Sequence, residues 1–149
     1  MKILVINGPN LNFLGIREVS VYGTADFDYL RQLVHKKCAQ EDILCRIFQS
    51  NHEGEIIDRL QDAYFDGTQG IVINPGAFSH YSFAILDALR SITTIPKIEV
   101  HISNIDDRED FRKQKITAQG CNKVIAGHGL NGYLEGIDEV VELANNMVN

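Results

Sequence analysis

The sequence predicts an α/β fold, with one domain built around a parallel β-sheet that has helices on both faces. Five short apolar runs, rich in Val and Ile, are each followed by a helical or turn segment, and no linker divides the chain. A continuous apolar run is typical of a strand buried on both faces, and strands that alternate with helices favour a parallel sheet with right-handed crossovers. The length of 149 residues fits a single domain, 1–149.

The expected elements alternate regularly along the chain. Strands are predicted at residues 2–6, 43–48, 70–73, 98–102 and 123–126. Apolar residues at i, i+3, i+4 spacing predict helices that follow Asp26, Ser50 and Ser79 and a closing helix at about 131–147, and a short charged helix or turn is expected at 106–113. No period is sustained between residues 7 and 23, so we expect there a long loop of the kind that forms lids or stays disordered.

Polar residues at helix starts predict where three of these helices begin. Asp26 is the expected N-cap of the first helix and Ser79 that of the third. Ser50 and Glu53 have the spacing of a capping box before the second.

Composition and charge exclude several classes of protein. The formal net charge is −6 and no basic run exceeds Lys36–Lys37, so the basic stripe of a nucleic-acid binder is missing. No apolar run approaches the roughly 18 residues of a membrane span, and the first apolar run is too short for a signal peptide. Cys38, Cys45 and Cys121 are widely spaced and form no Cys-x-x-Cys pair, which argues against a disulfide framework or a zinc site. We therefore expect a cytoplasmic protein with reduced thiols and with no metal, nucleic-acid or membrane partner.

The end of the third predicted strand is the most informative stretch. The run 70–73 stops at Asn74-Pro75-Gly76, because proline cannot donate to the ladder and glycine permits backbone angles that other residues avoid. Open α/β sheets bind ligands at the carboxyl ends of their strands, where the strand order reverses. With the order 2-1-3-4-5 this point lies between the first and third strands, whose loops carry Asn10, Asn12, Asn74 and His80.

Two further pairs of side chains are expected at the same crevice. Glu99 and His101 are two residues apart on the fourth strand, so they point to the same face. Arg17 and Tyr22 belong to the long loop. A tyrosine acts as a base at neutral pH only if a positive charge stabilises its phenolate, and one guanidinium about 4 Å away provides roughly 4 kcal/mol at an effective dielectric of about 20. These two residues therefore form a feasible base on a loop that can close.

Six blocks of the chain, in order, resemble the type II 3-dehydroquinate dehydratases. The resemblance runs from about residue 7 to residue 133, and all six blocks in register are far more specific than any one alone. They are Gly8-Pro9-Asn10-Leu11-Asn12-Phe13-Leu14-Gly15 with Arg17-Glu18 and Tyr22-Gly23; Gln49-Ser50-Asn51-His52-Glu53-Gly54-Glu55; Asn74-Pro75-Gly76-Ala77 with His80; Glu99-Val100-His101-Ile102-Ser103-Asn104-Ile105; Arg108-Glu109 with Phe111-Arg112; and Gly132-Tyr133.

The resemblance implies a reaction and a set of catalytic residues. Such enzymes convert 3-dehydroquinate to 3-dehydroshikimate by anti elimination of water through an enolate, without metal, Schiff base or organic cofactor, and the reaction serves both the shikimate pathway of aromatic biosynthesis and quinate catabolism. Tyr22 would be the base and Arg17 the lid residue that stabilises its phenolate. His101 would be the general acid, with Glu99 orienting its neighbours, and Asn12 would hold a water against the enolate oxygen.

The resemblance also implies a fold, an assembly and a substrate grip. The expected fold is a flavodoxin-like, doubly wound five-stranded sheet of order 2-1-3-4-5 that forms a single catalytic domain. The expected assembly is a dodecamer of trimers, in which Asp87 resembles the residue that these proteins project into a neighbouring subunit's site. Arg108 would support the lid. The substrate would be held by Asn74, His80, the backbone amides of Ile102 and Ser103, and Arg112.

One departure from the family pattern and three alternatives stay open on the sequence. Asp106-Asp107 stands where the family often has His-Ala, and these carboxylates could reduce the availability of Arg108; we expect them to alter affinity or loop motion and to leave the reaction unchanged. The main alternative is a flavin- or nucleotide-binding module of flavodoxin type. The others are a phospho-acceptor signalling domain, which the asparagines at residues 7 and 74 disfavour, and a catalytically silent assembly subunit.

Overall fold

The computed structural model describes all 149 residues and contains a single five-stranded sheet. The strands are β1 (Lys2–Asn7), β2 (Leu44–Gln49), β3 (Gly70–Asn74), β4 (Lys97–His101) and β5 (Lys123–Ala126). Their order is β2-β1-β3-β4-β5 and every neighbouring pair is parallel. This confirms the flavodoxin-like fold and the strand order expected from the sequence.

Helices cover both faces of the sheet, and short 3-10 turns follow several strands. The helices are α1 (Val19–Tyr22), α2 (Phe27–Gln40), α3 (Glu53–Phe65), α4 (Phe83–Ser91) and α5 (Asn131–Val148). The long loop after β1 therefore contains a 3-10 turn, Leu11–Phe13, and one turn of α-helix, although it shows no sequence period. Further 3-10 turns lie at Gly76–His80, Ile105–Asp107, Asp110–Lys113 and Thr117–Gly120.

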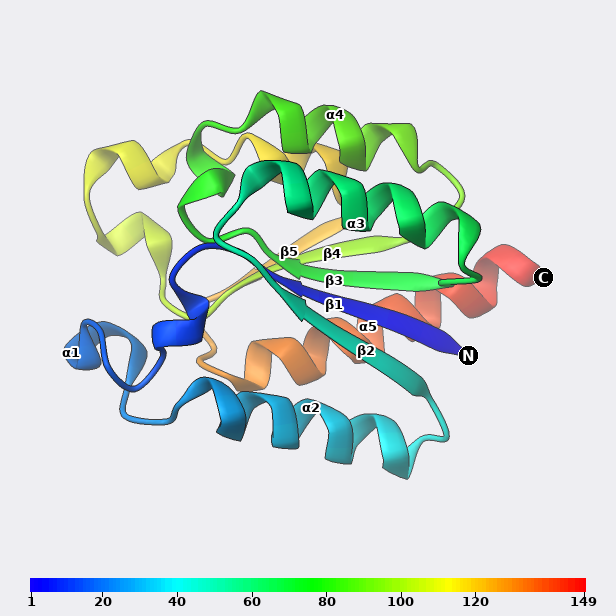
Figure 1. Ribbon diagram of the computed structural model, residues 1–149, viewed down its shortest axis with the longest axis horizontal. Coiled ribbons are helices and arrows are strands. Elements are labelled where there is room, and N and C mark those ends of the chain that lie inside the picture. The colour runs from blue at the N-terminus through cyan, green and yellow to red at the C-terminus, as the bar shows by residue number, and fades with distance from the viewer.

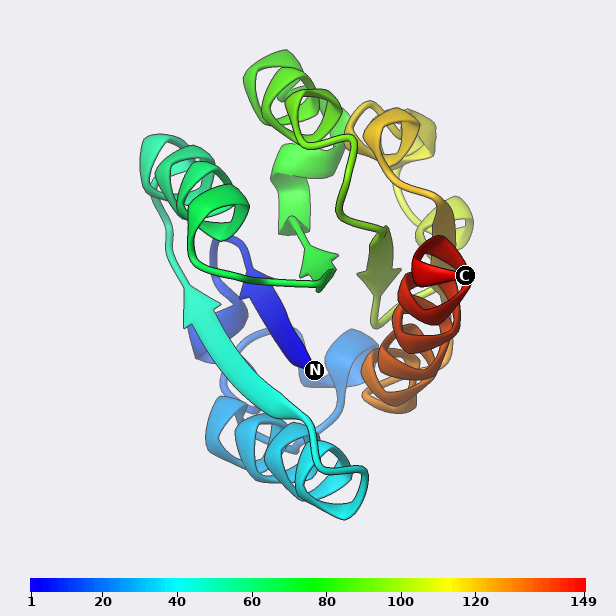
Figure 2. The ribbon, with the colours of Figure 1, turned by 90° about the vertical axis from the view of Figure 1, so that its right-hand side faces the viewer.

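The alternation of side chains along β1 divides the core into two layers. Ile3 and Val5 pack with residues of α2 and α5, whereas Leu4 and Ile6 pack with residues of α3 and α4. Period-two alternation of this kind is what a strand buried on both faces requires. The end-on view shows α3 and α4 on one side of the sheet and α2 and α5 on the other (Figure 2).

The carboxyl ends of the strands all lie at one edge of the sheet, where α1 and the segments after β4 are found (Figure 1). The chain termini lie toward the opposite edge. None of the helices has both the length and the apolar composition needed to cross a membrane.

Two of the three predicted helix starts are wrong. Asp26 caps α2 as expected, since its Oδ1 accepts a hydrogen bond of 2.8 Å from the backbone N–H of Tyr29. Ser79 does not cap α4, because the chain first forms the turn Gly76–His80, and Ser82 accepts the bond from the Ile85 N–H at 3.0 Å.

The expected capping box at α3 is not formed either. Glu53 accepts a hydrogen bond of 2.6 Å from the Ser82 hydroxyl and so joins α3 to α4. The Ser50 hydroxyl instead donates to Glu55 and accepts from the His52 N–H at 2.9 Å. A contact between helices has replaced the local cap.

Candidate active site

A cavity of about 150 Å³ opens at the carboxyl edge of the sheet. It is smaller than the roughly 300–1,000 Å³ typical of sites for drug-sized ligands, so it suits a small polar molecule. The structure adds five residues to its lining that the sequence did not assign to the site: Pro9, Leu11, Gly76, Ala77 and Ile105. Asn10, which was expected at this crevice, also lines it. The predicted residues that line it are Arg17, Tyr22, Asn74, His80, His101, Ile102, Ser103, Arg108 and Arg112.

Gly8 brings the loop after β1 against the loop after β3. Its N–H donates a 2.7 Å hydrogen bond to the carbonyl of Asn74. A Cβ at this position would lie 2.3 Å from the Pro75 carbonyl oxygen, so only glycine permits this approach. The backbones that follow β1 and β3 are therefore in direct contact at the switch point of the sheet, next to the cavity.

A buried tyrosine from the last helix holds the floor of the cavity. The Tyr133 hydroxyl donates to Asn7 Oδ1 at 2.7 Å and accepts from Asn74 Nδ2 at 2.9 Å. Burial raises the pKa of Tyr133, which therefore stays protonated and can serve as this donor. Asn74 Oδ1 in turn accepts the N–H of Gly76 at 3.1 Å. The amide of Asn74 is thus fixed by two partners, the Tyr133 hydroxyl and the Gly76 N–H. The position of Tyr133 in an apolar helix pattern gave no sign of its contact.

Glu99 and His101 form a buried pair, as their spacing on one strand predicts. Glu99 is fully buried, and its Oε2 lies 2.9 Å from His101 Nε2 and 3.2 Å from the Ser79 hydroxyl that donates to it. Its other oxygen, Oε1, accepts the hydroxyl of Thr117. His101 reaches the cavity, whereas Glu99 lies behind it and does not.

His80 faces His101 across the cavity wall. The two rings are stacked with centroids 6.3 Å apart and an interplanar angle of 21°. Burial lowers the pKa of His80, and its Nδ1 lies 2.7 Å from the carbonyl of Gln114. A neutral imidazole in this contact carries its proton on Nδ1, because a carbonyl can only accept, and Nε2 is left as an acceptor for a hydroxyl group.

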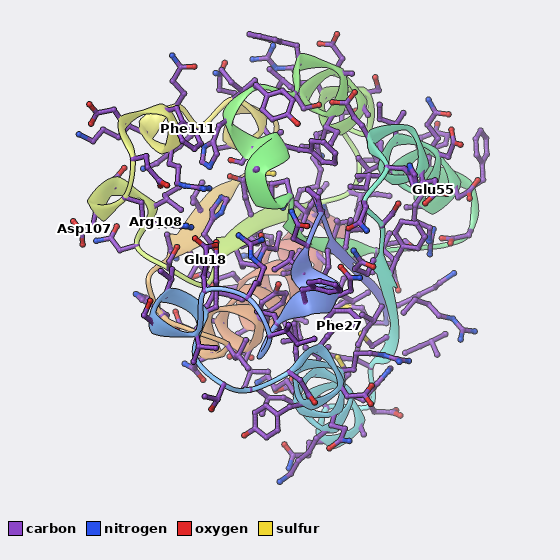
Figure 3. All side chains as sticks on the ribbon, turned by 60° about the vertical axis from the view of Figure 1, so that its left-hand side comes forward. Glu18, Phe27, Glu55, Asp107, Arg108 and Phe111 are labelled. Carbon is purple, nitrogen blue, oxygen red and sulfur yellow. The ribbon has the colours of Figure 1, made fainter.

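The hydrogen bond to the tyrosine of the long loop comes from Arg108 and not from Arg17. Arg108 Nη1 donates to the Tyr22 hydroxyl oxygen at 2.6 Å, and its other terminal nitrogen lies 3.2 Å from Glu18. Figure 3 shows Arg108 and Glu18 facing each other from the two segments. The guanidinium of Arg17 lies 4.9 Å from the centroid of the Tyr22 ring and pairs with Glu18. Sequence spacing favoured the nearer arginine because it contains no information on a contact across 86 residues.

Asp106 and Asp107 leave Arg108 free for this contact. Asp107 accepts a hydrogen bond of 2.8 Å from Asn104 and points outward (Figure 3). Asp106 pairs with Lys115 at 3.2 Å. The two carboxylates that depart from the family pattern therefore form no ion pair with Arg108.

Three other predicted residues differ in their relation to the cavity. Arg112 lines it, while its Nε pairs with Glu109 at 2.7 Å. Asn12 is exposed, lies outside the lining and accepts a 3.4 Å hydrogen bond from Gln49. Asp87 lies on the exposed face of α4, away from the cavity of its own chain.

Comparison with known proteins places this architecture in a family. The model of the class II dehydroquinases matches residues 1–141. The chain belongs to this family. A relative from Lachnoclostridium phytofermentans, named 3-dehydroquinate dehydratase, is 59% identical over 143 residues, covering 96% of this chain and 98% of its own. One of the same name from Lachnospira eligens is 54% identical over 144 residues, covering 97% and 98%.

Solved class II dehydroquinase structures agree with the fold. The type II dehydroquinase of Butyrivibrio crossotus superposes with a TM-score of 0.94 at 57% identity, over 95% of this chain and 97% of its own. That of Propionibacterium acnes gives 0.88 at 40% identity, over 97% and 96%. The resemblance and the enzyme class predicted from the sequence, a hydro-lyase of the type II 3-dehydroquinate dehydratase family, are confirmed. This membership decides against the flavin-binding and signalling alternatives.

Proposed function

We propose that this chain converts 3-dehydroquinate to 3-dehydroshikimate by anti elimination of water through an enolate, with Tyr22 as the base and His101 as the general acid. The observation that carries the proposal is the pair of opposed groups at one cavity. One is a tyrosine whose oxygen is bonded to a guanidinium, and the other is a histidine bonded to a buried carboxylate. Elimination next to a ketone needs such a pair, because one group takes the proton and the other protonates the departing hydroxyl.

The surroundings of Tyr22 support its role as the base that removes the C2 proton. Its hydroxyl oxygen accepts the short bond from Arg108, and the guanidinium of Arg17 lies over its ring. Two positive groups at these positions stabilise a phenolate far more than the neutral phenol. Arg108 acts on the oxygen that ionises, whereas Arg17 adds charge at the ring face and closes the loop over the substrate.

The contacts of His101 support its role as the acid. With Nε2 turned toward the Glu99 carboxylate, the imidazole donates its Nε2 proton there and is stabilised when it also carries a proton on Nδ1. Nδ1 has no hydrogen bond within the chain, and every fully buried side-chain nitrogen and oxygen does have one, so Nδ1 opens to the cavity. It is the atom that gives its proton to the leaving C1 hydroxyl.

The polar lining supports recognition of a small polyhydroxylated carboxylate. Arg112 provides a guanidinium for the carboxylate, together with the backbone amides of Ile102 and Ser103. Asn74, held by Tyr133, and the neutral His80 bind substrate hydroxyls. Asn12 reaches the enolate oxygen through a water.

Asp87 supports the proposal of a homo-oligomer. It is exposed on α4 and outside its own cavity, so a role at the site requires that a neighbouring copy receive it. We propose the dodecamer of trimers as this assembly, and light scattering of the purified protein tests it. A monodisperse monomer with full activity would contradict both the assembly and the role of Asp87.

The test of the reaction follows the enone absorbance of 3-dehydroshikimate after 3-dehydroquinate is mixed with the purified protein. EDTA is present throughout, and borohydride is added in a parallel run. Tyr22→Phe and His101→Ala are each expected to lower kcat by about 100-fold or more, the range of general acid–base catalysis. Tyr29→Phe and His35→Ala are matched controls, because both side chains are exposed and far from the cavity lining.

Each outcome of this assay bears on a separate part of the proposal. Turnover that survives both reagents and is lost only in the two site variants supports the reaction and both roles. An active Tyr22→Phe protein would refute the base assignment, and an active His101→Ala protein the acid assignment. A folded wild-type protein that leaves 3-dehydroquinate unchanged would refute the proposed function.

A further inference from the structure

We propose that Thr117 is a positioning residue for the acid. Its hydroxyl fixes the Glu99 carboxylate, and this carboxylate in turn keeps a proton on Nε2 of His101, so that the proton given to the substrate is a second one, carried on Nδ1. The inference rests on the proposed function, in which His101 is the proton donor. Thr117 is fully buried, does not line the cavity and donates its hydroxyl proton to Glu99 Oε1.

Apart from His101, Glu99 has only neutral donors, because no lysine or arginine pairs with it. The carboxylate is fully buried, and its hydrogen-bond partners are the hydroxyls of Ser79 and Thr117 and the ring of His101. A buried carboxylate stays charged only where donors replace the water it has lost. Ser79 and His101 both bond to Oε2, so Thr117 is the only donor to Oε1. Without it, this oxygen would be buried and unsatisfied.

The charge and orientation of Glu99 decide which nitrogen of His101 carries the proton. Nε2 lies 2.9 Å from Oε2, and two lone pairs at this distance repel each other, so an anionic carboxylate requires a proton on Nε2. If the carboxylate turned, or took up a proton on Oε2, Nε2 could instead become an acceptor. The ring would then hold its proton on Nδ1 as a neutral imidazole, which is a poor acid. Thr117 therefore acts on the reaction through two atoms that it does not itself touch.

The backbone places the Thr117 hydroxyl independently of the lid. The preceding residue, Ile116, donates its N–H to the carbonyl of Ser79 at 2.8 Å, which ties this turn to the one that carries the second donor. Three residues after Thr117, Gly120 lies so close to α4 that a Cβ added to it would be 2.7 Å from Leu89 Cβ. The turn is therefore packed tightly against α4. Neither contact involves α1 or Arg108. The position of the donor is therefore set by the rigid part of the fold, whether or not the loop is closed.

Thr117→Val and Thr117→Ser separate the hydroxyl from the shape of the side chain. Val has nearly the shape of Thr but cannot donate, whereas Ser keeps the donor and loses a methyl group. For Thr117→Val we expect kcat to fall about 10- to 100-fold, the usual effect of losing a partner that orients a reactive group. KM should change less than about twofold, since Thr117 does not reach the cavity. Thr117→Ser should recover most of kcat, and the basic limb of the pH–rate profile should move to lower pH in the Val variant only.

Nitrogen-15 NMR of the histidine side chains gives a readout that does not depend on turnover. The wild-type protein is expected to show Nε2 of His101 protonated throughout the pH titration. Thr117→Val should show a mixture of the two tautomers, and Thr117→Ala serves for the same comparison if the Val protein does not fold. Wild-type behaviour of the His101 signals and of kcat in a folded variant without the hydroxyl would overturn the proposal. Loss of activity in Thr117→Val with KM raised and His101 unchanged would also overturn it, because it would indicate a general distortion.

The two proposals fail in different ways. If His101→Ala were active, the acid assignment would be wrong whatever Thr117 does. If His101→Ala were inactive but Thr117→Val were normal, the acid would stand and the positioning role would be refuted.

Discussion

Replacing Tyr133 by Phe removes a single oxygen from beneath the cavity and tests whether the floor stabilises both the fold and the site. That oxygen bonds to Asn7 at 2.7 Å and to Asn74 at 2.9 Å. Both asparagines are buried, with exposed fractions of 0% and 3%, so water cannot replace the lost partner without rearrangement. Asn7 Oδ1 is left without a donor, and one N–H of Asn74 is left without an acceptor.

The expected magnitude follows from these two orphaned groups. Each buried polar group that loses its partner costs roughly 1–3 kcal/mol, so the two together should cost about 2–6 kcal/mol of unfolding free energy. For a domain of this size, each kcal/mol corresponds to a fall in Tm of roughly 2–4 °C, or about 4–24 °C in total. Asn74 also loses one of the bonds that fix its amide, so KM should rise several-fold while kcat changes less.

Urea unfolding and steady-state kinetics measure both effects. Tyr64→Phe is the matched control, because that ring is about half exposed, at 55%, and its hydroxyl makes no hydrogen bond in the chain. A double-mutant cycle with Asn7→Ala should give a coupling energy of about 1 kcal/mol or more. A loss below about 0.5 kcal/mol with an unchanged KM would show that the floor tolerates the missing oxygen, and the reasoning from unsatisfied groups would be refuted.

Three further predictions concern charge. Glu18→Gln removes the carboxylate that pairs with Arg108, so the positive charge of Arg108 beside the proposed base is no longer partly neutralised. The acidic limb of the pH–rate profile, which reports the loss of the base by protonation, should therefore move to lower pH. Burial acts to raise the pKa of Asp66, but hydrogen bonds, first from Thr68, outweigh it and lower the pKa to about 2. The carboxylate therefore stabilises the fold above the unfolded value of about 3.8, and this contribution is lost as the pH falls toward 2; Asp66→Asn should cost about 1 kcal/mol at pH 7, allowing for partial exposure, and nothing near pH 2, as measured by urea unfolding. Burial lowers the pKa of His80, so below about pH 6.5 this histidine is protonated in the unfolded chain but stays neutral in the folded chain. The free energy of unfolding of the wild-type protein should therefore decrease as the pH falls in this range, and His80→Asn should remove this pH dependence.

Each of these three predictions has a contradicting result. An acidic limb that moved to higher pH in Glu18→Gln would mean that the carboxylate serves mainly to position Arg108. A constant difference between wild type and Asp66→Asn from pH 7 to pH 2 would mean that the contribution is not electrostatic. Parallel stability curves for wild type and His80→Asn would mean that other groups cause the slope.

The parts of the site that the sequence predicted are those fixed by strand geometry. Asn74 ends one strand and His80 follows it, and Glu99 and His101 lie two residues apart on the next strand, so they point to the same face. Once the strands and their order are known, the pleat and the parallel direction leave these side chains no other edge to occupy. The cavity lining confirms that Asn74, His80 and His101 meet there, and Glu99 lies directly behind.

The parts that the sequence did not predict depend on contacts between segments far apart in the chain. Two serines precede α4 at helix-cap positions, and the spacing alone does not distinguish Ser79 from Ser82; the choice depends on whether the chain makes a 3-10 turn first. Arg108 bonds to Tyr22 across 86 residues. Tyr133 lies on the apolar face of a helix. Its ring fits the apolar spacing of that face, and the spacing does not indicate which partner its hydroxyl has. The apolar periodicity of a helix predicts which of its faces is buried, but it does not predict which polar atoms in the core form hydrogen bonds with that face.

The bond between Asn7 and Tyr133 spans 126 residues and joins the first strand to the last helix. On the ribosome, Asn7 emerges 126 residues before its partner, so the cavity floor cannot form until both residues have been synthesised. Until α5 emerges, β3 and β4 lack one of their covering layers, and a nascent chain stalled before residue 131 would expose an apolar sheet face. Such a chain would be a target for chaperones and proteases before it could ever bind substrate. The same tyrosine that holds Asn74 in the cavity wall thus makes completion of the site depend on the emergence of α5.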